Sequence, residues 1–427
     1  MTDNPHAPPL RGSLPPEGDA FSSWGGPAMA THPHAPPLRG SLPPEGDAFS
    51  SWGGPAMKTS LFAIALLVAA VSPLVAQAQS GTRTAPPAPT WQREAVPFYD
   101  TVHALQGIYG HWALPRAQAF DRSAQALTNA MAAMCSGNAD NNASKAALQS
   151  ARNAWLGTTR AWEELSAIAI GPVIARRTQR AIDFAPTRPA LIEKAIQAQP
   201  QGATAFERIG TPAKGLPALE WLLWTRPAQP NTPACGYAHE VALDVAREAT
   251  AVAADFARTA ASDWGAEEQQ EQSTQAMSEF VNQWVGGIER LRWAHMEKPL
   301  RAAQGSKPPE YPRSASQDTL AAWAATWKGL STVTQQSAQA PTPAPGEALV
   351  PLETYLRGKG LNPLADKLHQ AAQKVDASMA QVQKAGVKGK PAIQQAARDL
   401  AALKFLAESE VAPALQVSIG FSDADGD

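Results

Sequence analysis

The chain has 427 residues, with 36 basic and 38 acidic side chains, 38 prolines and two cysteines. Residues 79–427 carry 33 basic and 33 acidic residues, so this body of 349 residues is electrically neutral. A nucleic-acid-binding protein needs a basic excess or a basic stripe, and the absence of both excludes nucleic acid as a partner. At roughly 100–200 residues per domain, the body predicts two domains.

The first 56 residues differ from the rest of the chain. The 25 residues Pro5–Met29 recur letter for letter as Pro33–Met57. Solenoid repeats diverge and usually number three or more, and proline and glycine break helices and strands. We therefore expect residues 1–56 to be a disordered duplicated leader or a mis-assigned start, with translation beginning at Met57. A short binding repeat is the alternative.

Residues 57–78 have the features of a secretory signal peptide. Lys58 supplies a positive charge, an apolar run extends from Leu61 to Val75, and Ala76-Gln-Ala78 fits the small-x-small cleavage rule. The run is too short for a membrane span, so we expect no stable span after cleavage. Export to the periplasm is the prediction, with residues 79–96 as a Pro-rich linker.

The two cysteines, Cys135 and Cys235, are separated by 100 residues. An even pair in an oxidising compartment predicts one disulfide. Closing a loop of that size stabilises a fold by up to about 4–5 kcal/mol in the chain-entropy model. Two buried free thiols are the alternative.

The body is predicted to be all-α. Apolar residues recur at spacings of three and four over residues 151–169, 277–295 and 320–330, and no stretch alternates with period two. We expect two bundles of up-and-down helices, at 97–232 and 233–427. Several of the eleven tryptophans after the leader lie on these stripes. They fill the core between helices or line a cavity for a flat ligand such as haem.

No catalytic set can be assigned from the sequence. The five histidines of the body form no His-x-x-x-His or His-x-x-Glu pair, and there is no Gly-x-Ser-x-Gly elbow, P-loop or dinucleotide fingerprint. The most unusual segment is Lys214–Trp224, which reads KGLPALEWLLW. Glu220 lies there among large apolar residues, so we expect it to be buried and paired, metal-bound or protonated. Its expected partners are Arg176, Arg177 and Arg180, in a structural ion pair or a ligand site.

Segment Lys214–Trp224 resembles the signature region of the imelysin-like family, exported all-helical proteins first linked to peptidase activity. The arginine-rich run 176–180 followed by Asp183, the Trp-bearing helix 151–170 and the closing residues 415–427 agree with that resemblance. It implies two helical bundles related by an internal pseudo-repeat, with a site between them. It also implies an association with iron-responsive uptake systems in the periplasm or at the outer membrane.

The chain departs from the metal motif proposed for that family, Gly-x-His-x-x-Glu. Gly215 and Glu220 match the motif, but Pro217 stands where the histidine would be. Proline has no lone pair for a metal, and a single carboxylate is too little for a tight transition-metal site.

The tail holds a second, weaker metal candidate. Asp423 and Asp425 resemble the opening of a calcium loop whose downstream acidic ligand is missing. A hard-cation site, a solvated acidic tail and a tail docked into a basic cleft are the alternatives.

Our leading hypothesis is a periplasmic imelysin-like protein that binds a ligand in iron or haem acquisition and has no catalytic activity. The candidate ligand site combines Gly215 and Glu220 with Arg176, Arg177 and Asp183. One alternative is a metallopeptidase in which His111 or His239 replaces the missing histidine in space. Another is an interaction protein that docks on an envelope uptake component and binds no small ligand.

Overall fold

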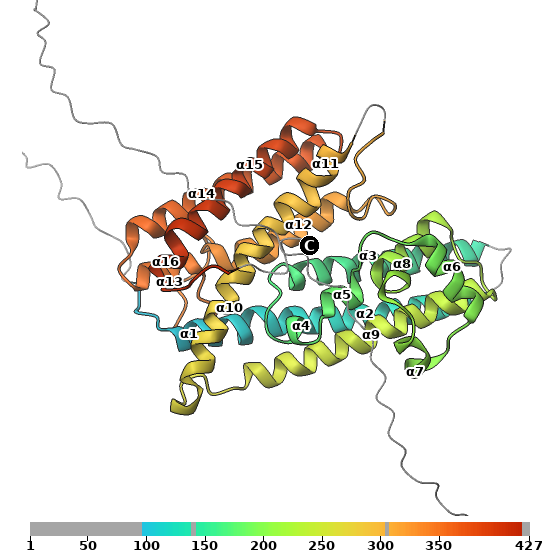
Figure 1. Cartoon of the computed structure of the whole chain (residues 1–427), viewed down its shortest axis with the longest axis horizontal. Helices are drawn as coiled ribbons and strands as arrows, with labels where there is room; N and C mark the ends of the chain where they lie inside the picture. Colours follow the sequence, from blue (N-terminus) through green and yellow to red (C-terminus); the bar gives the residue numbers. More distant parts are fainter. Residues whose placement is uncertain (1–95, 138–141, 304–306, 421–427) are drawn as a thin grey trace, which may run out of the picture. The chain divides into compact units, whose positions relative to one another are not determined.

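The computed structural model describes residues 96–137, 142–303 and 307–420 (Figure 1). Every regular element in these ranges is helical, which confirms the all-α prediction. The duplicated leader, the signal peptide, nearly all of the linker, Asp423 and Asp425 lie outside the described residues. None of the described helices combines the length and apolar character needed to cross a membrane.

Three long helices form one part of the fold, and the central one packs against both others. They are α2 (Leu114–Cys135) in the middle, with α3 (Asn142–Ser166) and α9 (Pro233–Ala260) against it. The chain enters α2 through α1 (Thr101–Gln106) and the π-helix η1 (Gly107–Ala113). Figure 1 shows α9 running alongside α2. The stripe predicted over residues 151–169 is confirmed within α3, because Ala151, Trp155, Thr158, Trp162 and Leu165 are all buried. Its predicted end is too late, because α3 ends at Ser166.

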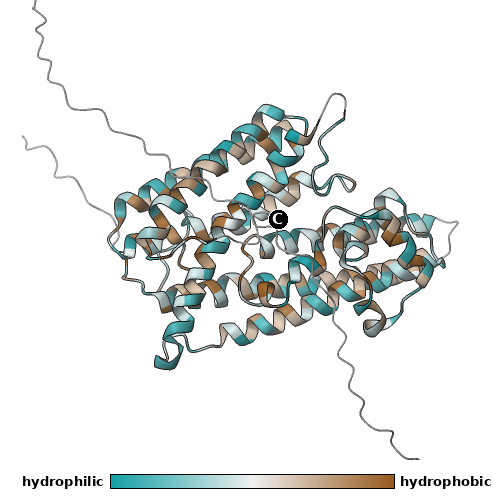
Figure 2. Ribbon diagram, viewed as in Figure 1, coloured by the Kyte–Doolittle hydropathy of each residue, from teal (hydrophilic) through white to brown (hydrophobic). Residues whose placement is uncertain are grey.

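The C-terminal helices form a second group in which α14 packs on α15, and α12 packs on both α14 and α3. Its members are α10 (Gln270–Glu289), α12 (Thr319–Thr334), α13 (Leu352–Gly358), α14 (Asn362–Ala385) and α15 (Lys390–Leu406). Shorter elements complete it: η4 (Glu267–Gln269), η5 (Arg290–Glu297), α11 (Lys298–Ala302), η6 (Ala407–Val411) and α16 (Ala412–Ala414). In Figure 2 the long helices carry both hydrophilic and hydrophobic residues, as amphipathic helices do.

Short helices joined by turns occupy the chain between α3 and α9, and they carry the imelysin-like segment. They are α4 (Pro172–Ala175), α5 (Thr178–Ile182), α6 (Pro189–Ala198), α7 (Gly202–Glu207), η2 (Thr211–Ala213), α8 (Gly215–Glu220) and η3 (Trp221–Thr225). Proline in the first turn of several of them fixes φ at a helical value, where a missing N–H costs nothing.

All of the described residues belong to one compact unit. The predicted boundary between 97–232 and 233–427 falls directly before α9, which packs along α2. The division into two pseudo-repeated bundles stays a prediction.

Tryptophan side chains fill the core and also join helices through their indole N–H groups. Trp112 donates to the carbonyl of Gly329 at 3.1 Å, and Trp284 donates to Thr334 Oγ1 at 2.9 Å. Both indoles are completely buried. Each therefore adds apolar contact and satisfies its one donor.

The C-terminal end of α3 lies very close to α10. A Cβ added to Gly287 of α10 would lie 2.0 Å from the carbonyl oxygen of Ala167, so only glycine permits this approach. Arg290, at the start of η5, donates a hydrogen bond to the carbonyl of Ser166 in the last turn of α3, which also carries Glu163.

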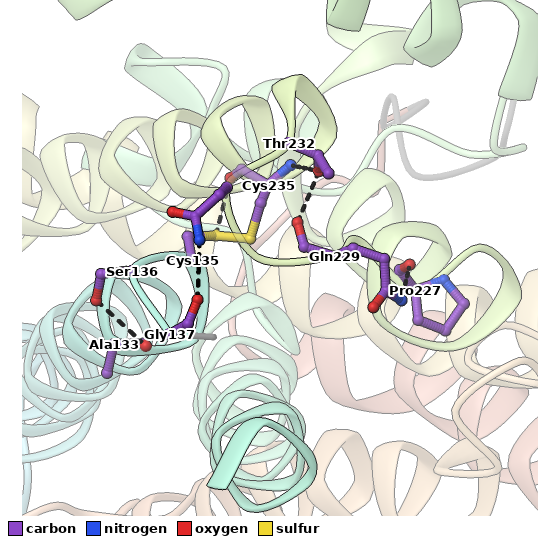
Figure 3. Close-up of a disulfide and its surroundings, with 9 residues drawn as sticks. Ala133, Cys135, Ser136, Gly137, Pro227, Gln229, Thr232 and Cys235 are labelled. Carbon is purple, nitrogen blue, oxygen red and sulfur yellow. Dashed lines mark hydrogen bonds between the residues drawn. A yellow bond between two sulfur atoms is a disulfide. The ribbon is translucent and has the colours of Figure 1, made fainter. Parts of the chain in front are cut away.

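Cys135 and Cys235 form the predicted disulfide (Figure 3). It joins the end of α2 to the start of α9, and Asn231 adds hydrogen bonds to the carbonyls of Cys135 and Gly137, each at 3.0 Å. Thr232 caps the start of α9 by accepting from the backbone N–H of Cys235.

Candidate functional site

The segment around Glu220 packs where the sequence predicts a buried carboxylate. Gly215 begins α8 with φ of 78°, and a Cβ there would lie 2.3 Å from the carbonyl oxygen of Ile182. Only glycine accepts both the left-handed backbone and this close approach. Gly215 therefore sets the spacing between α8 and α5, and Pro217 occupies the first turn of α8 as predicted.

Glu220 ends α8 and is only 7% exposed, so its predicted burial is confirmed. Its Oε1 accepts two hydrogen bonds from Ser316, one from the backbone N–H at 2.8 Å and one from the hydroxyl at 2.7 Å. The expected pairing with Arg176 is wrong, since that guanidinium binds Glu248 at 2.7 Å and Asp255 at 3.3 Å. Arg177 and Arg180 are exposed.

The arginine that binds the carboxylates beside this site is Arg313, which the sequence does not predict. Arg313 is 5% exposed, and its Nη2 donates to Glu163 Oε1 at 3.1 Å and to Asp183 Oδ2 at 2.5 Å. Asp183 Oδ2 also accepts from Trp162 Nε1 at 3.2 Å. The structure thus joins the predicted Asp183 to the Glu220 region through an arginine on another element.

Arg313 lies in the turn 311–318, which directly precedes α12. Both Arg313 and Gln317 have left-handed φ, of 60° and 62°. Non-glycine residues adopt this region at a cost, and such strain concentrates at functional sites. In the same turn Ser316 binds Glu220, and Asp318 binds Arg160 at 2.5 Å. No periodic or compositional signal in the sequence distinguishes this turn from an ordinary helix start.

The ionic groups behind the site are deeply buried. Burial raises the pKa of Glu163, and the charge of Arg313 opposes that rise. Thr326 donates to Glu163 Oε2 at 3.1 Å, so both carboxylate oxygens are hydrogen-bonded. Burial lowers the pKa of Arg290, whereas Glu163 and Asp183 raise it. Burial alone would lower the pKa of Arg313, but Asp183, Glu163 and Glu220 together raise it.

Two of the π-helices adjoin this network. η3 begins directly after Glu220, and η5 contains Arg290 and His295. Single π turns inside helices occur frequently at functional sites. Burial and the charge of Arg290 lower the pKa of His295 to about 3, despite an opposing effect of Asp183. His295 is therefore neutral at pH 7.

The lowered pKa of His295 predicts acid sensitivity. Below pH 6.5 the imidazole of His295 becomes protonated in the unfolded chain, whereas in the folded chain it stays neutral down to about pH 3. Stability therefore falls by at most about 1.4 kcal/mol per pH unit across this window and is unaffected above it. Urea unfolding at pH 7.5 and 4.5 should show a loss that is larger, by at most roughly 3 kcal/mol, in the unmodified protein than in His295→Asn. An equal loss of stability in the two proteins would contradict a lowered pKa for His295.

A cavity of about 650 Å³ opens beside the network. Asp183, Glu220 and Arg313 contribute to its wall, together with Tyr311, which is 5% exposed. The Tyr311 hydroxyl has no hydrogen-bond partner within the described ranges. Much of the remaining wall is alanine and proline, including Ala185, Pro186, Pro217, Ala294, Pro299 and Pro312. Its size lies in the range of small-molecule sites.

The donor set of this wall fits a bare metal ion poorly. Asp183 and Glu220 supply two carboxylates, and a third lining carboxylate, Glu310, is exposed and pairs with Lys307. No group of three His, Cys, Asp or Glu side chains suited to a metal occurs in the described part of the chain. Neither His111 nor His239 is among the described lining residues, and no lining residue there is a histidine, methionine or cysteine. Tyr311 is the only described wall residue of a type that ligates haem iron, so iron entering this cavity must bring ligands of its own.

Comparison with solved structures supports the fold. An imelysin-like protein from Psychrobacter arcticus 273-4 is 18% identical with a TM-score of 0.60, and the match covers 76% of this chain and all of that one. A protein from Parabacteroides distasonis ATCC 8503, described as an iron-regulated protein A precursor, is 14% identical with a TM-score of 0.57. That match covers 74% of this chain and 95% of the other. No curated protein matches the chain.

The family model described as imelysin, peptidase M75, matches residues 113–411. This range contains the α8 segment, Asp183 and the turn that carries Arg313. The chain therefore belongs to the imelysin family.

Proposed function

We propose that this protein is exported to the periplasm and binds a ligand of iron or haem acquisition in the cavity beside Glu220, without cleaving it. The observation that carries the proposal is a cavity of about 650 Å³ with Asp183 and Glu220 on its wall. Arg313 and Ser316 hold these two carboxylates in place. Membership of the imelysin family and the description of one structural relative as iron-regulated support the link to iron.

Binding is favoured over peptidase chemistry by the residue at the motif position. Pro217 stands where the proposed metal histidine would be, and it lies on the cavity wall. A ligand held there is stabilised by shape and charge, with no metal-bound water assigned to attack a peptide. The metallopeptidase alternative predicts chelator-sensitive cleavage of a peptide by the purified protein.

The binding test compares ferric citrate and haemin titrated into the purified protein and into Glu220→Ala. We expect the affinity for whichever of them binds to fall at least tenfold in Glu220→Ala, because the variant removes a carboxylate from the inner wall of the cavity. Glu410→Ala is the matched control, since Glu410 is exposed and pairs with the exposed Lys367. Binding that is unchanged by Glu220→Ala would exclude this site.

Export is tested separately by osmotic-shock fractionation of cells that express the full chain. We expect the protein in the periplasmic fraction, with a mature N-terminus near Gln79. Recovery in the cytoplasmic fraction with residues 57–78 retained would contradict export.

A further inference from the structure

The charges around the cavity are unevenly placed. Three carboxylates, of Glu163, Asp183 and Glu220, meet two guanidinium groups, of Arg290 and Arg313, in one coupled network. Of these groups, Asp183, Glu220 and Arg313 line the cavity, so this part of its wall holds two carboxylates against one guanidinium, an excess of one negative charge. A buried charge of this kind must be matched by an opposite one.

The uncompensated charge lies on the cavity side. Asp183 uses Oδ2 for Trp162 and Arg313, and Glu220 uses Oε1 for Ser316. The other oxygen of each carboxylate accepts no hydrogen bond from the residues that the structure describes. Both residues line the cavity, and each keeps one carboxylate oxygen without a donor among the described residues.

The remaining charges do not cancel this one. The Arg313 Nε and Nη2 groups are engaged by Glu163 and Asp183. At the mouth, Lys307 and Glu310 pair with each other at 3.1 Å, and Lys298 is exposed, where solvent screens its charge. The cavity therefore favours a ligand with a cationic group over a ligand with an anionic group.

We infer that the ligand of this cavity is an organic molecule carrying a single ammonium group, which donates to the free oxygens of Asp183 and Glu220. An ammonium has three donors and no acceptor, which matches two acceptor oxygens without donors. A bare metal ion would find only Asp183 and Glu220 in a space far larger than itself, because the third lining carboxylate, Glu310, is exposed and pairs with Lys307. The alanine and proline wall suits an aliphatic chain behind the ammonium. This inference rests on the proposed function in that the cavity is the ligand site.

An ammonium group of this kind can belong to an iron chelate with an amine arm or to a free amine, and matched probes separate the two sources. Ferrioxamine B is a ferric hydroxamate chelate with a pendant five-carbon ammonium arm, whereas the cyclic ferrioxamine E is neutral and lacks it. N-acetylcadaverine reproduces the arm without iron, and N-pentylacetamide is its neutral counterpart. Calorimetric titration of the purified protein with all four requires no variant.

We expect at least one cationic probe to bind at least tenfold more tightly than its neutral counterpart. Preference for ferrioxamine B identifies a chelate as the source, and preference confined to N-acetylcadaverine identifies a free amine. Glu220→Gln and Asp183→Asn should each abolish the preference, and Glu410→Gln should keep it. Two variants are used so that a folding defect in one leaves the other informative.

Equal binding of cationic and neutral probes would overturn the inference. If ferric citrate or haemin bound in a Glu220-dependent way without any cationic preference, the proposed function would stand and this inference would fail. If none of these compounds bound, both would fail.

Discussion

Arg313→Met is expected to lower the free energy of unfolding by about 3–5 kcal/mol. The variant leaves Glu163 and Asp183 without the guanidinium that binds both, and Glu163 is only 3% exposed. A buried carboxylate that loses its partner keeps the desolvation cost without the compensating attraction. Urea unfolding followed by circular dichroism measures the change.

The matched control is Lys328→Met, which removes an ion pair with Glu164 on the exposed side of α3. We expect that change to cost less than about 1 kcal/mol, because solvent screens exposed pairs. Glu163→Gln in the Arg313→Met background should recover part of the loss, because it removes a buried charge. A loss below 1 kcal/mol for Arg313→Met, or no recovery, would show that the network does not depend on this arginine.

Loss of the Cys135–Cys235 disulfide is expected to lower the free energy of unfolding by about 2–5 kcal/mol. The bond closes a loop of 100 residues, for which the chain-entropy model gives about 4.7 kcal/mol. That loop contains α3 through α8, and with them Glu163, Asp183 and Glu220. Removing the bond therefore widens the unfolded ensemble of the segments that build the site.

The measurement compares urea midpoints with and without dithiothreitol, for the unmodified protein and for the Cys135→Ser, Cys235→Ser double variant. The chain has only two cysteines, so the reductant should shift the first and leave the second unchanged. Thiol titration shows whether the reductant has opened the bond. If the bond is open and the urea midpoint of the unmodified protein is unchanged, the prediction is contradicted.

The site was partly predictable from the sequence. The burial of Glu220 followed from its apolar neighbours, and the family resemblance pointed to Asp183. The prediction that Glu220 pairs with Arg176 rests on nearness in the chain and is wrong. Arg176 pairs with Glu248 of α9. Glu220 is bound by Ser316 and Asp183 by Arg313, both from the turn before α12. That turn has no hydrophobic period, so nothing local marks it.

The sequence by itself determined the helical class, the buried faces and the disulfide. Helix periodicity is a local property, since residues three and four apart share a face and become buried together. Two cysteines allow only one intramolecular pairing. The tertiary structure alone decided which charges meet and where the cavity lies. Those contacts join residues about a hundred positions or more apart, such as Glu163 and Arg313, and depend on how closely the helices approach. Electrostatic pairing follows distance in space, and spacing along the chain does not encode it.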